Sequence, residues 1–249
     1  MYEELGKGAA GEDNIAAVPD QHVRTDGADI IYMSAINQII GVFAGGSTLL
    51  TGMRLESPSL RRLANYEIQP VGITAEPDGD VAFMLHPESP LVLEENEGLE
   101  CIQRVSGNAG AEAVFCVVFL SDGTVSPIHG NIFHVRATAT LPAATAYVWQ
   151  NAEIAFDNPL PVGRYQLMGA HVMTVDGVAF RFVPIGEAHR PGGICNVIDG
   201  ISSYELQRFG GLGVWCEFDQ ITPPSIEVVN SVTATGTAVR MVLDLVKIG

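Results

Sequence analysis

Lysine is nearly absent from this chain, and the sequence has no large excess of positive charge in any segment. Only Lys7 and Lys247 are lysines, and 13 basic residues stand against 29 acidic ones among 249 residues, for a formal net charge of −16. A protein that binds nucleic acid by neutralising phosphates needs clustered positive charge. We therefore expect no direct contact with nucleic acid.

Long apolar runs and cysteine pairs are also missing. No run approaches the roughly 18 apolar residues of a membrane-spanning helix, and the first residues lack the basic-then-apolar order of a signal peptide. The four cysteines, Cys101, Cys116, Cys195 and Cys216, form no CxxC pair. We expect buried thiols in a protein made in a reducing cytoplasm. A disulfide between Cys101 and Cys116 on neighbouring strands remains an alternative.

The motifs of common enzymes do not occur. There is no Gly-x-Ser-x-Gly, no GxGxxG or P-loop frame and no His-x-His, and His129 and His134 would point to opposite faces of a strand. His171 and His189 lie on separate segments that could come together in space. We assign no catalytic, cofactor-binding or metal-binding residue and expect no enzyme, although a metal-dependent bicupin stays open as an alternative.

What the sequence does contain is a series of short apolar or alternating segments separated by Gly, Pro, Asn and Asp. They begin near Ile30 and continue to residue 248. This spacing is typical of an antiparallel sandwich or barrel. Asp176-Gly177, between two such segments, predicts a hairpin. The segment Tyr147-Val-Trp149 is apolar on both faces of a strand, which suggests that one face meets a neighbouring molecule.

Three pairs of segments resemble each other in the same order. Residues 53–60 resemble 154–161 because each contains an apolar residue, a spacer and a second apolar residue, followed by an acid, a small polar residue and proline. Each segment is followed by a Tyr that opens an alternating run. The other two pairs are 81–94 with 214–227, and 113–120 with 238–245. Repetition in one order predicts two copies of one β module.

The repeat sets the expected domains. Residues 1–29, rich in Gly, Ala and acids, are expected to form an N-terminal arm, with a first jelly roll over 30–128 and a second over 129–249. Pro58 and Pro159 are 101 residues apart and Pro90 and Pro223 are 133 apart, so the second copy is expected to contain an insertion at about 184–213, with a short helix over Ile198–Phe209.

Two successive jelly rolls with an N-terminal arm and no catalytic motif resemble the double jelly-roll major capsid proteins of tailless icosahedral, membrane-containing bacteriophages. The resemblance covers about 30–249 and is one of architecture. It implies a virion protein whose homotrimers form pseudo-hexameric tiles of a shell. The implied partners are neighbouring trimers, penton or minor capsid proteins, and an internal lipid membrane.

Six residues are candidates for subunit contacts. Tyr2 and Leu5 would anchor the arm, Arg61 and Arg62 form the only tight basic pair, and Arg190 and Phe209 lie in the expected insertion. Besides the capsid subunit and the bicupin, a carbohydrate-binding pair of β-sandwiches stays open as an alternative.

Overall fold

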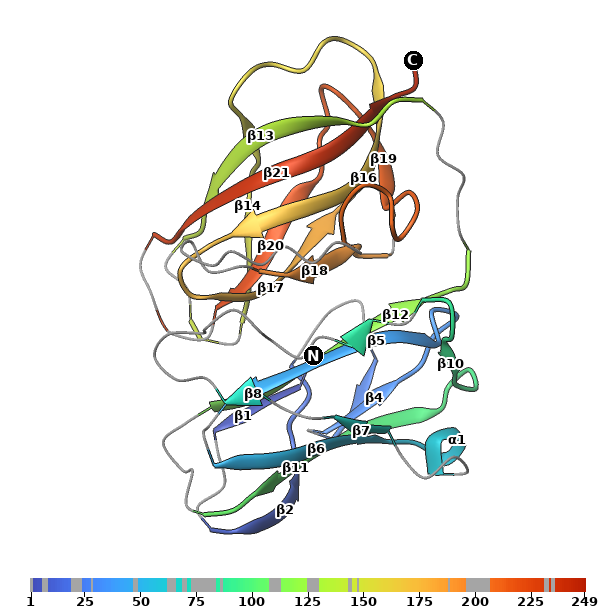
Figure 1. Cartoon of the computed structure of the whole chain (residues 1–249), viewed down its shortest axis with the longest axis vertical. Helices are drawn as coiled ribbons and strands as arrows, with labels where there is room; N and C mark the ends of the chain where they lie inside the picture. Colours follow the sequence, from blue (N-terminus) through green and yellow to red (C-terminus); the bar gives the residue numbers. More distant parts are fainter. Residues whose placement is uncertain are drawn as a thin grey trace. The chain divides into compact units, whose positions relative to one another are not determined.

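The computed structural model shows an all-β protein of antiparallel sandwiches, so the expected fold class is confirmed (Figure 1). The chain divides into two compact units, Met1–Thr124 (unit 1) and Val125–Gly249 (unit 2). The residues that the structure describes are 2–5, 9–18, 24–27, 29–46, 49–61, 66–68, 71–72, 84–85, 87–107, 113–124, 130–142, 145–146, 148–187, 189–195, 207–230, 233 and 236–249. In these ranges no helix is long and apolar enough to cross a membrane.

Unit 1 consists of two sheets around one apolar core. The β12 sheet has the order β1-β12-β5-β10, with β8 and β9 also on β5, and the β11 sheet has the order β3-β4-β11-β6-β7, with β2 also on β11. The elements are β1 (Tyr2–Leu5), β2 (Gly11–Asn14), β3 (Thr25–Asp26), β4 (Ile30–Tyr32), β5 (Gln38–Gly46), β6 (Leu50–Glu56), α1 (Pro58–Arg61), β7 (Tyr66–Ile68), β8 (Val71–Gly72), β9 (Met84–Leu85), β10 (Leu91–Val92), β11 (Gly98–Val105) and β12 (Ala113–Ser121). Alternate residues of facing strands, such as Val42, Leu55 and Val114, form the core.

Unit 2 is built in the same way. The β21 sheet has the order β15-β13-β21-β16-β19, and the β20 sheet has the order β14-β20-β17-β18. The strands are β13 (Phe133–Thr140), β14 (Trp149–Ala152), β15 (Ala155–Phe156), β16 (Arg164–Met173), β17 (Gly177–Val183), β18 (Gly192–Ile194), β19 (Cys216–Asp219), β20 (Ser225–Asn230) and β21 (Ala238–Lys247). Phe180, Phe182 and Trp215 pack together in its core, with ring centroids 5.7–6.2 Å apart.

The two units have the same strand order. The paths β1-β12-β5-β10 and β2-β11-β6-β7 of unit 1 correspond, strand by strand, to β13-β21-β16-β19 and β14-β20-β17-β18 of unit 2. Eight strands in two four-stranded antiparallel sheets is the arrangement of a jelly roll. Corresponding strands are evenly offset: β5 and β16 begin at Gln38 and Arg164, and β12 and β21 at Ala113 and Ala238, differences of 126 and 125 residues.

The expectation of an N-terminal arm outside the core is wrong. β1 pairs with β12 from Tyr2 opposite Cys116 to Leu5 opposite Ala113, and β2 pairs with β11. Tyr2 and Ile15 are completely buried in the core of unit 1. Because β1 and β2 correspond to β13 and β14, the segment assigned to an arm supplies the first two strands of the first jelly roll.

The expectation of an insertion at 184–213 is also wrong. Its described part contains β18, which pairs with β17 and is the counterpart of β7 rather than an addition. The expected helix over Ile198–Phe209 lies almost wholly outside the described residues. The hairpin predicted at Asp176-Gly177 is also wrong, because β16 and β17 belong to different sheets and the turn carries the chain from one sheet to the other.

Candidate functional site

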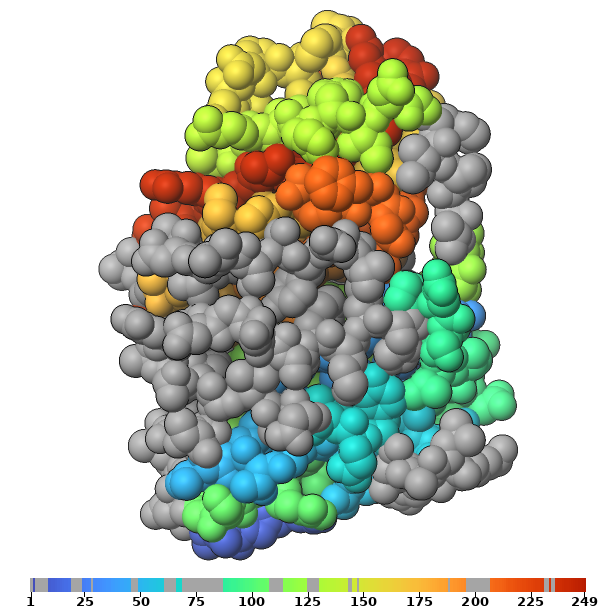
Figure 2. Space-filling view, viewed as in Figure 1, coloured from blue at the N-terminus to red at the C-terminus, as the bar shows by residue number. Residues whose placement is uncertain are grey.

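The outward face of the β21 sheet carries a buried carboxylate, Asp244. Met241, Leu243 and Leu245 point into the core of unit 2, so Asp244, between the last two, points away from it. Its side chain is nevertheless fully buried, because residues 208–211, which we call the strap, lie over it. In Figure 2 the orange atoms of this part of the chain lie against the red of β21 and below the lime of β13.

Asp244 has three hydrogen-bond partners, of which Arg208 and Phe209 belong to the strap. Arg208 donates from Nε to Oδ2 and from Nη2 to Oδ1, each at 2.8 Å, a bidentate pair. The Phe209 N–H donates to Oδ2 at 2.7 Å, and His134 Nδ1 on β13 lies 2.8 Å from Oδ1. Burial alone would raise the pKa of Asp244, but these hydrogen bonds outweigh it and hold the pKa below its usual value.

The strap also lies directly on β16. The Gly210 N–H donates to the Met168 carbonyl at 3.0 Å. A Cβ added at Gly169 would lie 2.5 Å from the Gln207 carbonyl oxygen and 3.0 Å from Arg208 Cα, so only glycine lets the strap approach this closely. Gly169 is opposite Asp244 and follows a register shift in β16. The β-bulge in β16 and the missing side chain of Gly169 thus make room for the strap against this strand.

His171 lies two residues beyond Gly169 on the same outward face of β16. Its Nε2 atom is buried and has no hydrogen-bond partner among the described residues. Burial lowers the pKa of His171, the positive charge of Arg208 lowers it further, and Asp244 acts in the opposite direction. These effects together favour the neutral form of the imidazole.

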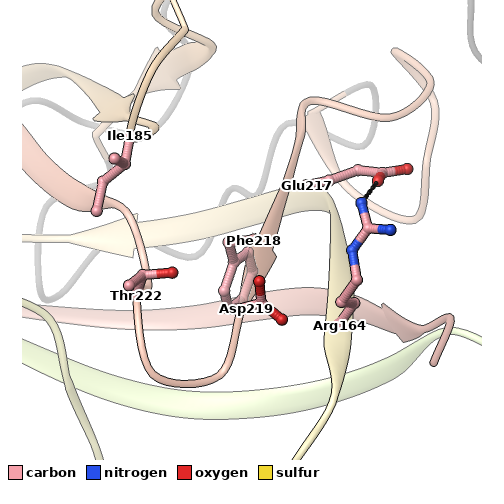
Figure 3. A pocket seen from close by; sticks show the side chains of 6 residues that line it. All are labelled: Arg164, Ile185, Glu217, Phe218, Asp219 and Thr222. Atoms are coloured by element: carbon pink, nitrogen blue, oxygen red, sulfur yellow. Dashed lines mark hydrogen bonds and ion pairs between the residues drawn. The ribbon is translucent and has the colours of Figure 1, made fainter.

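A second feature is a hollow at one end of unit 2, shown in Figure 3. It measures about 180 Å³ and is lined by Arg164, Ile185, Glu217, Phe218, Asp219 and Thr222. Arg164 Nη2 pairs with Glu217 Oε2 at 2.7 Å, the contact drawn as a dashed line in Figure 3. Ligand pockets usually measure about 300–1,000 Å³. The hollow is therefore too small to be a well-formed site for an organic substrate.

The loops at this hollow carry exposed aliphatic side chains. Ile185 and Ile221 are 73% and 80% exposed, and Val162, two residues before Arg164, is 85% exposed. They contribute little to the stability of the unit.

The outward face of the β11 sheet in unit 1 is charged. Arg54 pairs with Glu12 at 2.9 Å and with Glu56 at 2.7 Å, and Arg104 also donates to Glu12. The pKa of Glu12 is lowered by its hydrogen bonds to Arg104 and Arg54. Four charges paired in this way form a structural surface rather than a site with an unpaired reactive group.

The structure places the six candidate contact residues in different settings. Tyr2 is buried in its own unit and donates from its hydroxyl to the Leu99 carbonyl, so its assignment as a subunit contact is wrong. The backbone of Leu5 pairs with Ala113, and Arg61 ends α1. The side chains of Leu5 and Arg61, and all of Arg62, lie outside the described residues.

Arg190 and Phe209 are both described. Arg190 Nη1 donates to the carbonyl oxygens of Glu187 and His189, at 2.8 and 3.2 Å. Phe209 is 55% exposed, and its ring lies edge-on to His134 at 5.3 Å and beneath the Arg208 guanidinium at 4.7 Å. Phe209 therefore belongs to the strap, which sequence reasoning missed. The available signal was Asp244, the lone acid of β21.

His189 and the four cysteines have structural roles or settings. His189 Nε2 lies 2.9 Å from the Trp215 carbonyl and 2.8 Å from Glu187 Oε2. The four cysteines are free and buried, and burial raises the pKa of Cys101, Cys195 and Cys216. Across the described ranges, no three His, Cys, Asp or Glu side chains gather where they could hold a metal ion.

Comparison with known proteins gives one fold-level likeness. No protein-family model and no curated protein sequence matches the chain. Among solved structures, the chain is similar to the major capsid protein P2 from bacteriophage PM2, with 11% sequence identity, 95% of this chain and 98% of that chain covered, and a TM-score of 0.23. A TM-score of this size carries no argument about function.

Proposed function

We propose that this chain is a major capsid protein of an icosahedral virus, assembled as trimers in which six jelly rolls form a pseudo-hexameric tile. The observation that supports the proposal is the tandem repeat of one strand order within a single chain. Two successive eight-stranded jelly rolls give a trimer six similar bodies, which can fill a hexagonal lattice without six separate chains.

In this proposal the chain acts by assembly and has no catalytic role. Its partners are its own copies, neighbouring trimers, penton or minor capsid proteins and an internal lipid membrane, and it resides in the virion. The net charge of −16 is consistent with a shell that does not bind the genome directly.

Native mass spectrometry of the full chain tests the proposal. We expect a trimer of about 80 kDa, three times the 26.5 kDa chain, and hexagonal tiles or closed shells in electron micrographs of the concentrated protein. A chain that stays monomeric at high concentration would contradict it.

Elemental analysis of the same sample separates the capsid proposal from the bicupin alternative. The capsid subunit is expected without stoichiometric Fe, Mn or Zn. One bound transition-metal ion per chain, combined with a monomeric mass, would favour the metal-dependent enzyme instead.

A further inference from the structure

The strap, residues 208–211, is attached to unit 2 mainly through one side chain. Arg208 and the Phe209 N–H both donate hydrogen bonds to the Asp244 carboxylate, and one backbone hydrogen bond joins the Gly210 N–H to the Met168 carbonyl. The preceding residue, Gln207, is fixed separately, since its side-chain amide bonds both the N–H and the carbonyl of Ile194 at 3.1 Å. Release of the strap therefore leaves the sheets and Gln207 in place.

The closed strap carries two local costs. Phe209 has a φ of 56°, a left-handed conformation that bulky side chains rarely adopt. The Nε2 atom of His171 is buried without a hydrogen-bond partner in the part of the chain that the structure describes, and a buried polar atom without a partner is unfavourable. Opening the strap relieves both costs, and the Asp244 contacts oppose it. Such a balance makes a segment that can switch between two states.

We propose that the strap is released in mild acid, when protonation of His171 frees residues 208–211 from the outward face of the β21 sheet while the sandwich stays folded. His171 takes up a proton poorly beneath the strap, because the ring is desolvated and Arg208 lies beside it. In the open state both effects disappear, and Nε2 can donate to water. Protonation therefore favours the open state.

The cationic groups near His171 fit this direction, including Arg240, which lies two residues along β21 from the position opposite this histidine. Arg208 faces it from the strap, His134 and Arg136 lie on β13, and Asp244 lies on β21. Among the described residues near His171, Asp244 is the acidic one, and its attraction for protonated His171 is weakened because Arg208, Phe209 and His134 already occupy its oxygens. The lowered pKa of Asp244 keeps it ionised as His171 titrates, so histidine protonation comes first.

The direction of the pH effect follows from the coupling between proton binding by His171 and opening of the strap. Closing the strap lowers the pKa of His171, so the open state binds more protons below the ordinary histidine value of about 6.5. The opening equilibrium therefore rises by up to about tenfold for each pH unit below that value, until the pH reaches the pKa of the closed state.

Amide hydrogen exchange of the full chain, corrected for intrinsic rates, measures this opening. Between about pH 7 and about pH 5, protection of the Phe209 and Gly210 amides is expected to fall by about tenfold or more, while protection in β17 and β20 stays constant. His171→Gln, which cannot take up a proton, is expected to remove the pH dependence. His189→Gln removes another histidine of unit 2 and is expected to keep it.

Two outcomes would overturn the proposal: constant protection of the strap in the wild-type protein, or an equal fall in His171→Gln. Asp244→Asn is a second test variant. It is expected to open the strap at neutral pH and to raise the pKa of His171, as measured by NMR. If that variant does not fold, the His171→Gln comparison still decides. The test does not depend on assembly, so its failure leaves the capsid proposal standing.

Discussion

The two units share one strand order, but the sheet whose outward face is apolar in unit 1 does not correspond to the sheet whose outward face is apolar in unit 2. In unit 1 the apolar outward face belongs to the β12 sheet, where Phe115 and Phe43 are 1% and 6% exposed, with ring centroids 5.4 Å apart. In unit 2 it belongs to the β20 sheet, where Ala179, Ile194 and Val229 are buried. None of these five residues belongs to either core cluster, so each unit buries apolar side chains on a second face.

The other sheet of each unit is polar on its outward face. The β11 sheet of unit 1 presents Arg54, Arg104 and Glu12, and the β21 sheet of unit 2 presents Asp244 and His134. These sheets are not counterparts, since the β11 sheet corresponds to the β20 sheet and the β12 sheet to the β21 sheet. Inward residues therefore fix the shared topology, and outward residues are free to differ between the copies.

This difference changes the interpretation of the strand near Trp149. Its apolar outward side was expected to meet a neighbouring molecule. Trp149 instead packs under Arg181 of the same sheet at 4.1 Å, and Arg181 pairs with Glu227 at 2.5 Å. An apolar outward face is therefore not by itself a sign of a subunit contact in this chain.

The largest expected effect tests whether the apolar outward face of unit 1 supports the fold. Phe115→Asp places an unpaired carboxylate where the side chain is 1% exposed, so we expect a loss of more than the roughly 3–5 kcal/mol of a buried Phe→Ala change. Urea unfolding followed by circular dichroism measures it. Both tryptophans, Trp149 and Trp215, lie in unit 2, so their fluorescence reports that unit separately.

Val162→Asp is the matched control, because it makes a similar apolar-to-acid change at a side chain that is 85% exposed. We expect its unfolding curve to match that of the wild-type protein. If Phe115→Asp also unfolds at the wild-type urea concentration, the apolar outward face of the β12 sheet contributes nothing, and the contrast between the two sheets fails.

The sequence predicted the fold class and a tandem repeat, and the errors in the domain bounds come from two misaligned pairs of segments. Pro90 and Pro223 are 133 residues apart, whereas the corresponding strands β10 and β19 begin 125 residues apart. Residues 113–120 and 238–245 are β12 and β21, which hold corresponding places in their sheets. Residues 53–60 span the end of β6 and the start of α1, whereas 154–161 span β15, and β6 corresponds to β17. An alternating run that ends in an acid and a proline is common to many strand ends, so it cannot fix a position in the strand order.

These two misalignments produced both the arm and the insertion. Once β6 was matched to the wrong strand, the segments that form β1 and β2 had no counterparts and the second copy gained surplus residues. The sequence of β2, Gly-Glu-Asp-Asn, has no apolar alternation because its side chains are mostly exposed. Its place in the sheet depends on backbone pairing with β11, which side-chain patterns do not report. The strap was equally hidden, since Arg208 and Asp244 are 36 residues apart.

A smaller effect is expected from the buried carboxylate of unit 1. Glu97 is 8% exposed and accepts hydrogen bonds from the Glu94 N–H and from the backbone and hydroxyl of Ser59 at the start of α1. Burial would raise the pKa of Glu97, but these bonds outweigh it and lower the pKa below its usual value. The stabilisation is therefore present above the ordinary Glu value and is lost as the pH falls through the lowered pKa.

Glu97→Gln removes the charge and is expected to cost about 1–3 kcal/mol of unfolding free energy at neutral pH, measured by urea unfolding. Glu94→Gln, at an exposed neighbour, is the control and is expected to change little. The cost should shrink in strong acid, where Glu97 itself is protonated. A cost that is independent of pH would mean that shape, rather than charge, holds the start of α1.

The smallest effect is expected on the charged outward face of the β11 sheet. Arg104 and Glu12 have side chains that are 57% and 37% exposed, whereas those of Arg208 and Asp244 are 11% and 0% exposed. Water and salt screen the first pair and not the second. Arg104→Gln should therefore leave the urea midpoint within experimental error, at low and at high salt. A clear, salt-sensitive loss would mean that the paired charges of unit 1 stabilise their sheet as the Asp244 contacts stabilise the strap, and the two polar faces would then be equivalent.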